Sequence, residues 1–114
     1  MKVLLALPGV ATPEVREIDG TLESLQKLVG GYIELVRVRR AVLRNMDALV
    51  DLDVFVNEDG RNLELPVNRI LGGFDLLGPI VIAAHDDEGE TIGLTDAQIA
   101  RAIPELRAAG ENVQ

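Results

Sequence analysis

The pattern of apolar and polar residues divides the chain into short strand-like and helix-like segments. Residues 2–7 form an apolar run that ends at a Pro-Gly turn, and residues 14–19 alternate between polar and apolar side chains. These two runs predict a β-hairpin. Residues 22–29 place leucine and valine at helical spacing, and residues 32–38 are mainly aliphatic and β-branched. The pattern therefore predicts a helix followed by a strand.

Capping signals mark the ends of two helices. Thr21 is a good N-cap for the first helix, and the glycine pair at 30–31 favours the left-handed conformation that ends it. Thr95 and Gln98 have the spacing of a capping box, which predicts a second helix from this point. Pro104 lies inside that second helix, so we expect a kink or two short helices there, and Gly110 is expected to end it.

The middle of the chain gives less uniform signals. Residues 39–50 have apolar positions at helical spacing, which predicts a short helix, with an extended strand and a loop as the alternative. Residues 53–65 and 82–94 resemble each other, since each has the pattern of a strand, an acidic turn ending in glycine, and a strand. Either an internal duplication or two ordinary hairpins explain this, and shared turn chemistry favours the second. Residues 66–71 can form one helical turn with proline at its first position.

These segments predict the α+β class, with a mostly antiparallel sheet of about five or six strands and two main helices packed on one face. We expect a single domain over residues 1–110 and a frayed tail over residues 111–114. Hydrophobic residues make up 47% of the chain, which is enough for one core.

Composition and charge restrict the possible functions. The chain carries 19 acidic and 11 basic side chains, for a net charge of -8, which argues against direct binding to a nucleic-acid backbone. Because there is no cysteine, disulfides, thiolate zinc sites and cysteine nucleophiles are excluded. The first apolar run is too short for a signal peptide, and no run has the length of a membrane span. We expect a cytoplasmic protein with no membrane contact and no cofactor.

Catalytic and metal-binding patterns are poorly represented. Ser24 is the single serine and lacks the glycines of a nucleophile elbow, and His85, the single histidine, stands beside Asp86 near the end of a predicted strand. The acidic turn at residues 86–90 lacks the spacing of a calcium loop, so a solvated turn is the simpler interpretation. We therefore predict a protein that is not an enzyme.

Four residues form the preferred candidate binding site. These are Tyr32, Glu34, Asn68 and Arg69, in which a planar amide and a guanidinium stand together on a predicted short turn. Such a pair can recognise a carboxylate, a phosphate or a base edge. The structural alternative, which carries more weight, is that Asn68 caps a turn and Arg69 pairs with an acidic neighbour such as Glu34 or Glu58.

Several blocks of the sequence resemble a known family, the domain of unknown function numbered three-eight-four-six. The blocks run in the same order over nearly the whole chain: Asp19-Gly20, Leu22, Leu25, residues 28–34, residues 57–60, Leu65-Pro66, Asn68-Arg69, residues 78–81 and residues 94–96. The chain departs from the family pattern in the arginine-rich stretch from Arg37 to Asp47. The resemblance implies an origin in phages, plasmids or integrated elements, and no established activity.

The leading functional hypothesis is a small non-catalytic binding or regulatory protein of a mobile element, acting on a host protein. The alternatives are a pocket protein that sequesters a small anionic ligand such as a nucleotide, through Asn68 and Arg69, and an acidic mimic of nucleic acid. The arginines at 37, 39, 40 and 44 form a basic island that serves either a partner or the acidic hairpins of the chain itself.

Overall fold

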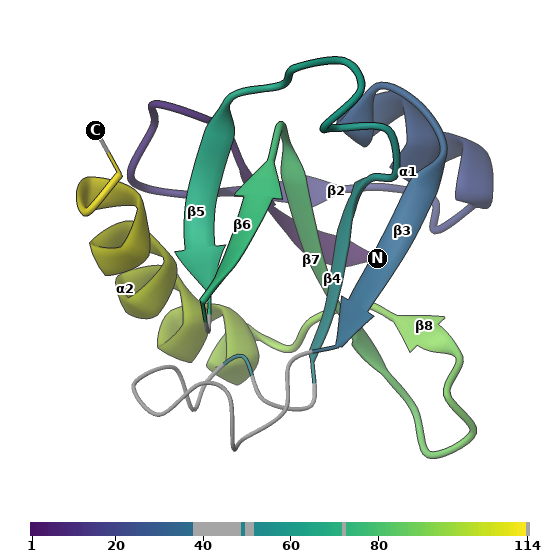
Figure 1. Ribbon diagram of the computed structural model, residues 1–114. Helices are drawn as coiled ribbons and strands as arrows, with labels where there is room; N and C mark the ends of the chain where they lie inside the picture. Colours follow the sequence, from purple (N-terminus) through teal and green to yellow (C-terminus); the bar gives the residue numbers. More distant parts are fainter. Residues whose placement is uncertain (38–48, 50–51, 72, 114) are drawn as a thin grey trace.

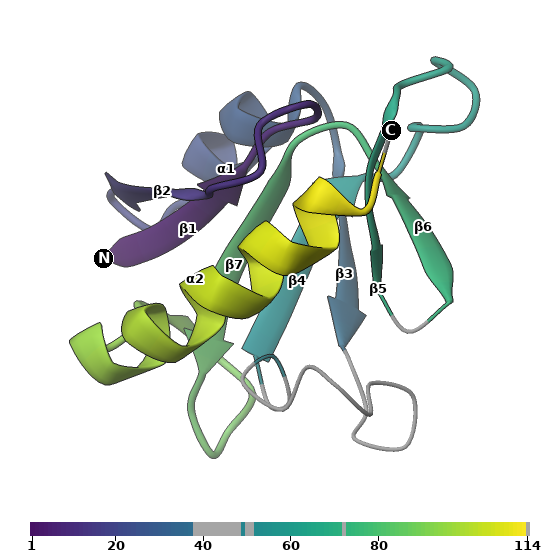
Figure 2. The ribbon, with the colours of Figure 1, turned by 90° about the vertical axis from the view of Figure 1, so that its left-hand side faces the viewer.

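The main feature of the fold is an antiparallel sheet with one helix on each face (Figures 1 and 2). The computed structural model describes residues 1–37, 49, 52–71 and 73–113. The elements follow in the order β1 (Lys2–Ala6), β2 (Glu14–Glu17), α1 (Leu22–Val29), β3 (Ile33–Arg37), β4 (Leu52–Asn57), β5 (Val67–Leu71), β6 (Phe74–Leu77), β7 (Ile80–His85), β8 (Thr91–Ile92) and α2 (Asp96–Glu111).

In the described part of the chain, six strands form the main sheet and two strands form a small second sheet. The main sheet has the order β2-β1-β7-β4-β3, with β8 paired to the end of β7, and all of these pairs are antiparallel. Among the described strands, β5 and β6 pair only with each other, and β6 contacts β4 of the main sheet. The α+β class and the antiparallel sheet expected from the sequence are confirmed.

The two faces of the main sheet bury separate sets of side chains. Leu4, Val54 and Ile82 are in register on one face, where they pack with α2 and the small sheet. Val81 and Phe55 are in register on the other face, under α1. The prediction that both helices pack on one face is therefore wrong. The central strands β4 and β7 are buried on both sides, so each face needs its own cover.

The predicted helix ends agree with the structure. Thr21 accepts a hydrogen bond from the amide of Ser24, and Gly30 ends α1 with a φ of 81°. Both hydrogen bonds of the capping box are present at the start of α2. Helix α2 continues through Pro104 as one element and reaches Glu111, so the predictions of two short helices and of an end at Gly110 are wrong.

Two predictions in the middle of the chain are also wrong. Residues 66–71 do not form a helical turn, because Val67–Leu71 is strand β5, paired with β6 through an irregular register. Residues 53–65 do not form a hairpin, because residues 58–64 are turns that lead from β4 towards the small sheet. The second acidic turn does join a hairpin, β7 to β8, so this structure does not support a duplication.

Except for buried Leu49, the predicted helix at 39–50 lies outside the described residues, and so do the basic island's side chains.

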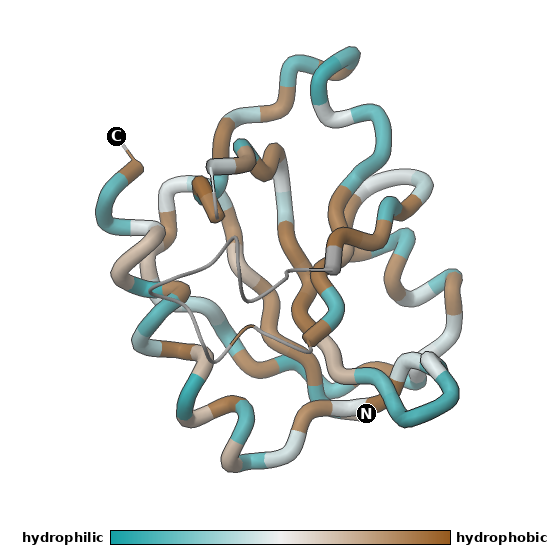
Figure 3. The backbone as a smooth tube through the Cα atoms, turned by 60° about the horizontal axis from the view of Figure 1, so that its bottom comes forward, coloured by the Kyte–Doolittle hydropathy of each residue, from teal (hydrophilic) through white to brown (hydrophobic). Residues whose placement is uncertain are grey.

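Hydrophobic residues follow the strands at the middle of the molecule, and hydrophilic residues follow the outer loops (Figure 3). In the described part of the chain, neither helix combines the length and apolar composition that crossing a membrane requires.

Candidate functional site

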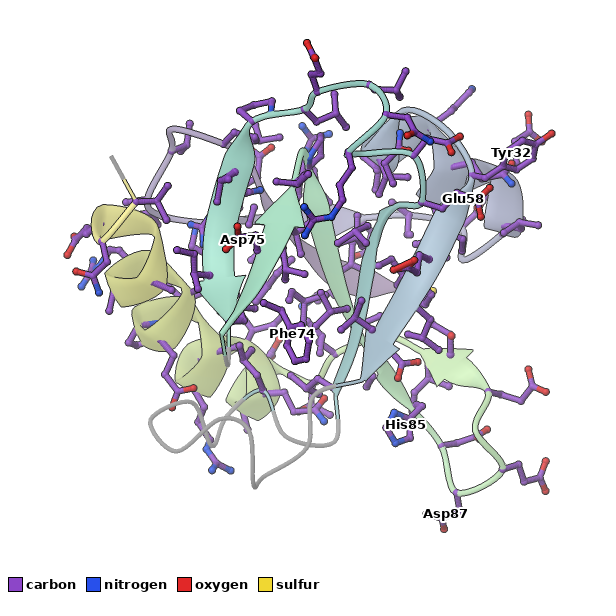
Figure 4. All side chains as sticks on the ribbon, viewed as in Figure 1. Tyr32, Glu58, Phe74, Asp75, His85 and Asp87 are labelled. Carbon is purple, nitrogen blue, oxygen red and sulfur yellow. The ribbon has the colours of Figure 1, made fainter. Side chains whose placement is uncertain are left out.

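The four residues expected to form a binding site lie in two different places. Asn68 and Arg69 are in β5 and are almost completely buried, with exposed fractions of 2% and 0%. Tyr32, just before β3, is 68% exposed and lies beside Glu58 at the opposite side of the molecule (Figure 4). Glu34 is an exposed residue of β3. The structure therefore keeps Asn68 beside Arg69, and Tyr32 near Glu34, but it does not gather the four residues around one cavity.

The guanidinium of Arg69 is enclosed by main-chain carbonyl groups. Its Nε donates to the carbonyl of Leu106 in α2 at 2.8 Å. Its Nη2 donates to the carbonyls of Val10, at 3.1 Å, and Ala11, in the turn between β1 and β2. Its Nη1 donates to the side-chain oxygen of Asn68. Burial lowers the pKa of Arg69, but an arginine remains charged at any physiological pH.

Asn68 completes this buried network. Its amide nitrogen donates to the carbonyls of Ala6, at the end of β1, and Gly78, in the turn between β6 and β7, each at 2.7 Å. We call Asn68 and Arg69 the polar clamp. The clamp joins the small sheet to both the β1–β2 region and α2, near the helix C-terminus, where the helix dipole favours a positive charge.

The clamp replaces both sequence interpretations of these residues. Within the described residues, Arg69 forms no ion pair with Glu34 or Glu58, so the expected pair is wrong. Asn68 binds distant carbonyls instead of capping its own turn. Because these donors are already engaged inside the fold, the geometry gives no support to an anion site at Arg69.

A groove with acidic walls lies between β3, β4 and β6. Its volume is about 320 Å³, and we call it the acidic groove. Three acidic residues line it, Glu34, Glu58 and Asp75, together with one basic residue, Arg61. The other lining residues are Val36, Val56, Asn57, Gly60, Asn62, Leu76 and Leu77.

The fold brings these acidic residues to the groove from three different strands or strand ends. Glu34 pairs with Val56, whose side chain is in the core on the α2 face, so the register places Glu34 on that same face of β3. Glu58 directly follows β4, and Asp75 is in β6, which contacts β4; both residues are labelled in Figure 4. Glu34 was among the predicted site residues, but Asp75 and Arg61 were not, because residues 66–71 were expected to form a helical turn and residues 53–65 a hairpin.

A second hollow, of about 390 Å³, separates the outer side of β5 from the C-terminal half of α2. Its lining is mostly apolar: Ile70, Pro104, Glu105, Ala108, Ala109, Asn112 and Val113. The polar clamp lines neither this hollow nor the acidic groove.

His85 does have an aspartate partner, but it is not the neighbour in sequence. Its Nδ1 lies 2.9 Å from Oδ1 of Asp53, which is fully buried, and Thr91 donates to the other oxygen of Asp53 at 3.4 Å. Ser24 belongs to a separate network at the start of α1, with Thr21 and Asp19. The structure thus shows a histidine–aspartate pair without the serine of a catalytic triad.

The acidic turn between β7 and β8 is organised by its own backbone. One oxygen of Asp86 accepts hydrogen bonds from the amides of Glu88 and Glu90, each at 2.9 Å. This is the ordinary chemistry of an aspartate turn. Within the described residues, no group of three or more histidine, aspartate or glutamate side chains is arranged to hold a metal ion.

Comparison with protein families agrees with the resemblance noted in the sequence. Residues 1–107 match the family model described as Domain of unknown function (DUF3846), so the chain belongs to this family. No curated protein and no solved structure matches the chain.

Proposed function

We propose that this DUF3846 protein is a non-catalytic binding protein whose acidic groove holds a basic segment of a partner protein. The observation that carries the proposal is the collection of Glu34, Glu58 and Asp75 in one groove, with Arg61 as the opposing charge. Within the part of the chain that the structure describes, Glu34, Glu58 and Asp75 form no ion pair. A concave surface with an excess of one charge attracts and orients a ligand of the opposite charge.

We infer that the protein belongs to a mobile element and acts inside the host cell. The resemblance to proteins of phages and plasmids suggests a mobile-element protein that acts in the cytoplasm on a protein of its host, as a regulator. The net charge of -8 is consistent with a basic partner and keeps the protein away from bare nucleic acid.

The other candidate functions have less structural support. An anion pocket would need the guanidinium of Arg69, which already donates to carbonyls inside the fold. Hydrolysis by a serine nucleophile would need Ser24 near the pair of His85 and Asp53, but Ser24 is hydrogen-bonded to Asp19 at the start of α1. We retain the nucleic-acid mimic only as an outcome of the experiment below.

The test compares two variants that lose the same amount of charge in different places. The first replaces the groove carboxylates with amides: Glu34→Gln, Glu58→Gln and Asp75→Asn. The control changes three exposed residues of the β7–β8 turn: Asp87→Asn, Glu88→Gln and Glu90→Gln. Each protein also carries a photo-crosslinking side chain at Asn62, which lines the groove.

Crosslinking in host lysate followed by mass spectrometry measures the result. We expect the original protein and the control to capture the same basic protein, and the groove variant to lose it. Equal capture by both variants would refute the proposal. If duplex DNA displaces the captured protein from the groove, the mimic becomes the better description of the same site.

A further inference from the structure

The outer edge of β3 borders the acidic groove. Within the described residues, β3 pairs with β4 alone, so its other side is an edge of the main sheet. An edge strand presents unpaired backbone N–H and C=O groups that can accept another strand.

The register identifies which backbone groups point outward. The amide of Glu58 donates to the carbonyl of Tyr32 at 3.0 Å, so this residue pair uses the inward side of β3. In an antiparallel ladder the inward-bonded residues alternate. Glu34 therefore bonds inward to β4, and the backbone groups of Ile33 and Leu35 point away from the sheet.

The two edges of the main sheet differ in their protection. Strand β2, at the other edge, consists of Glu-Val-Arg-Glu, and an ion pair of 2.8 Å joins Arg16 to Glu14 along it. Charged side chains of this kind discourage the addition of a further strand. Strand β3 reads Ile-Glu-Leu-Val-Arg and carries more aliphatic residues, including Leu35, which is 42% exposed. The β3 edge is thus the better docking edge.

The side chains of β3 define what an added strand should contain. Glu34 lies on the groove face, while Ile33 and Leu35 lie on the α1 face. A residue directly opposite Glu34 would form a non-hydrogen-bonded pair, the type in which side chains approach most closely. A lysine or arginine there can reach Glu34, and the residues on either side of it meet the aliphatic face.

We propose that the partner segment is an extended strand that pairs with the β3 edge and alternates basic and aliphatic residues, with the basic side chains in the acidic groove. This inference rests on the proposed function, which assigns the groove but not the backbone pairing. In this mode of binding, main-chain hydrogen bonds provide affinity and alternate side chains provide specificity.

The probe is a short capped peptide that alternates valine and lysine, labelled with a fluorophore. Two matched peptides serve as controls: one with the same composition but with all lysines grouped, and one with alternate backbone amides methylated. Anisotropy titrations compare three proteins: the original protein, a double variant with Glu34→Gln and Asp75→Asn (the groove pair), and a double variant with Asp87→Asn and Glu88→Gln (the control pair). Amide hydrogen exchange by NMR reports on Ile33 and Leu35.

We expect the alternating peptide to bind about tenfold or more tightly than either control peptide. Added salt should weaken this binding, because it screens the attraction between the lysines and the acidic groove. It should slow exchange at the amides of Ile33 and Leu35, and the groove pair should weaken binding while the control pair does not. Absence of binding, or equal binding of the methylated or grouped peptide, would overturn this inference.

The two proposals fail in distinguishable ways. If the groove pair weakens binding but exchange at Ile33 and Leu35 is unchanged, the edge pairing is overturned and the groove function stands. If exchange slows but the groove pair binds as well as the original protein, the groove is overturned as the site of the basic side chains, and both proposals fall.

Discussion

Replacing Arg69 with alanine should strongly destabilise the fold. Arg69 is fully buried, and its donors reach three separate parts of the chain: the β1–β2 turn, α2 and the neighbouring Asn68. Alanine removes both this bulk and every one of these hydrogen bonds. We therefore expect a loss of folding stability that does not depend on any bound ligand.

The magnitude follows from two contributions. Truncating a large buried side chain costs about 2–5 kcal/mol through lost packing and the resulting cavity. Each buried carbonyl left without a donor costs about 1–3 kcal/mol. The carbonyls of Val10 and Ala11 are only partly buried, so water can replace part of that loss. We therefore expect a loss on the order of 4 kcal/mol or more, a large share of the 5–15 kcal/mol typical of a domain.

Urea unfolding followed by circular dichroism measures this loss. Arg69→Lys keeps a positive charge but lacks the planar fork, so it should also lose a substantial part of the stability. Arg16→Ala is the control, because Arg16 is an exposed arginine with one carboxylate partner, Glu14. Loss of an exposed ion pair costs about 0–1 kcal/mol.

A decrease of less than about 1 kcal/mol for Arg69→Ala would refute the clamp, because that is the range of an exposed ion pair. Hydrogen exchange provides a second, local criterion. If Arg69→Lys still folds, the protection of its backbone amides against hydrogen exchange should fall first in β5 and at the end of α2, the elements that Arg69 joins. Uniform loss over the whole sheet would contradict that expectation.

Three further predictions concern single positions. Leu25→Ala should cost about 2–5 kcal/mol in urea unfolding, because Leu25 is a buried side chain of α1 that packs against the main sheet. Hydrogen bonds from the Ser24 hydroxyl and from Thr21 lower the pKa of Asp19 to about 2. The ionised Asp19 therefore stabilises the fold above the ordinary pKa of 3.8, and this contribution is lost as the pH falls to about 2. The difference in urea midpoint between the original protein and Asp19→Asn should shrink as the pH is lowered from 3.8 to about 2. Gly110→Ala should destabilise, against the usual gain of about 1 kcal/mol in a helix, because the new Cβ would lie 2.7 Å from Arg69 Nη2; a higher melting temperature would contradict this.

Local sequence signals predicted the elements that depend on local chemistry. Thr21, Gly30 and the pair Thr95 and Gln98 mark helix ends because they satisfy backbone groups within a few residues in sequence. The β1–β2 and β7–β8 hairpins were predicted for the same reason. The faces that the helices cover could not be predicted, because apolar stripes on two helices do not say on which side of a sheet each one packs.

The misread segment is the one that depends on distant partners. A proline at 66 and glycines at 72 and 73 are compatible with a capped helical turn, and they equally flank a strand. What favours the strand is tertiary: Asn68 binds carbonyls at Ala6 and Gly78, which are 62 and 10 residues away. An Asn-Arg pair gives no local sign of whether its polar groups face a ligand or the interior.

The polar clamp and the acidic groove are nevertheless coupled through the small sheet. Arg69 holds β5, β5 pairs with β6, and β6 contributes Asp75 to the groove wall. A variant that loosens the clamp should therefore displace a wall of the groove and weaken binding there, although Arg69 does not line the groove. Loss of binding in Arg69→Ala would for this reason say nothing about contact with a ligand. The substitutions at Glu34, Glu58 and Asp75 are the informative ones, because these side chains are exposed and no part of the clamp depends on them.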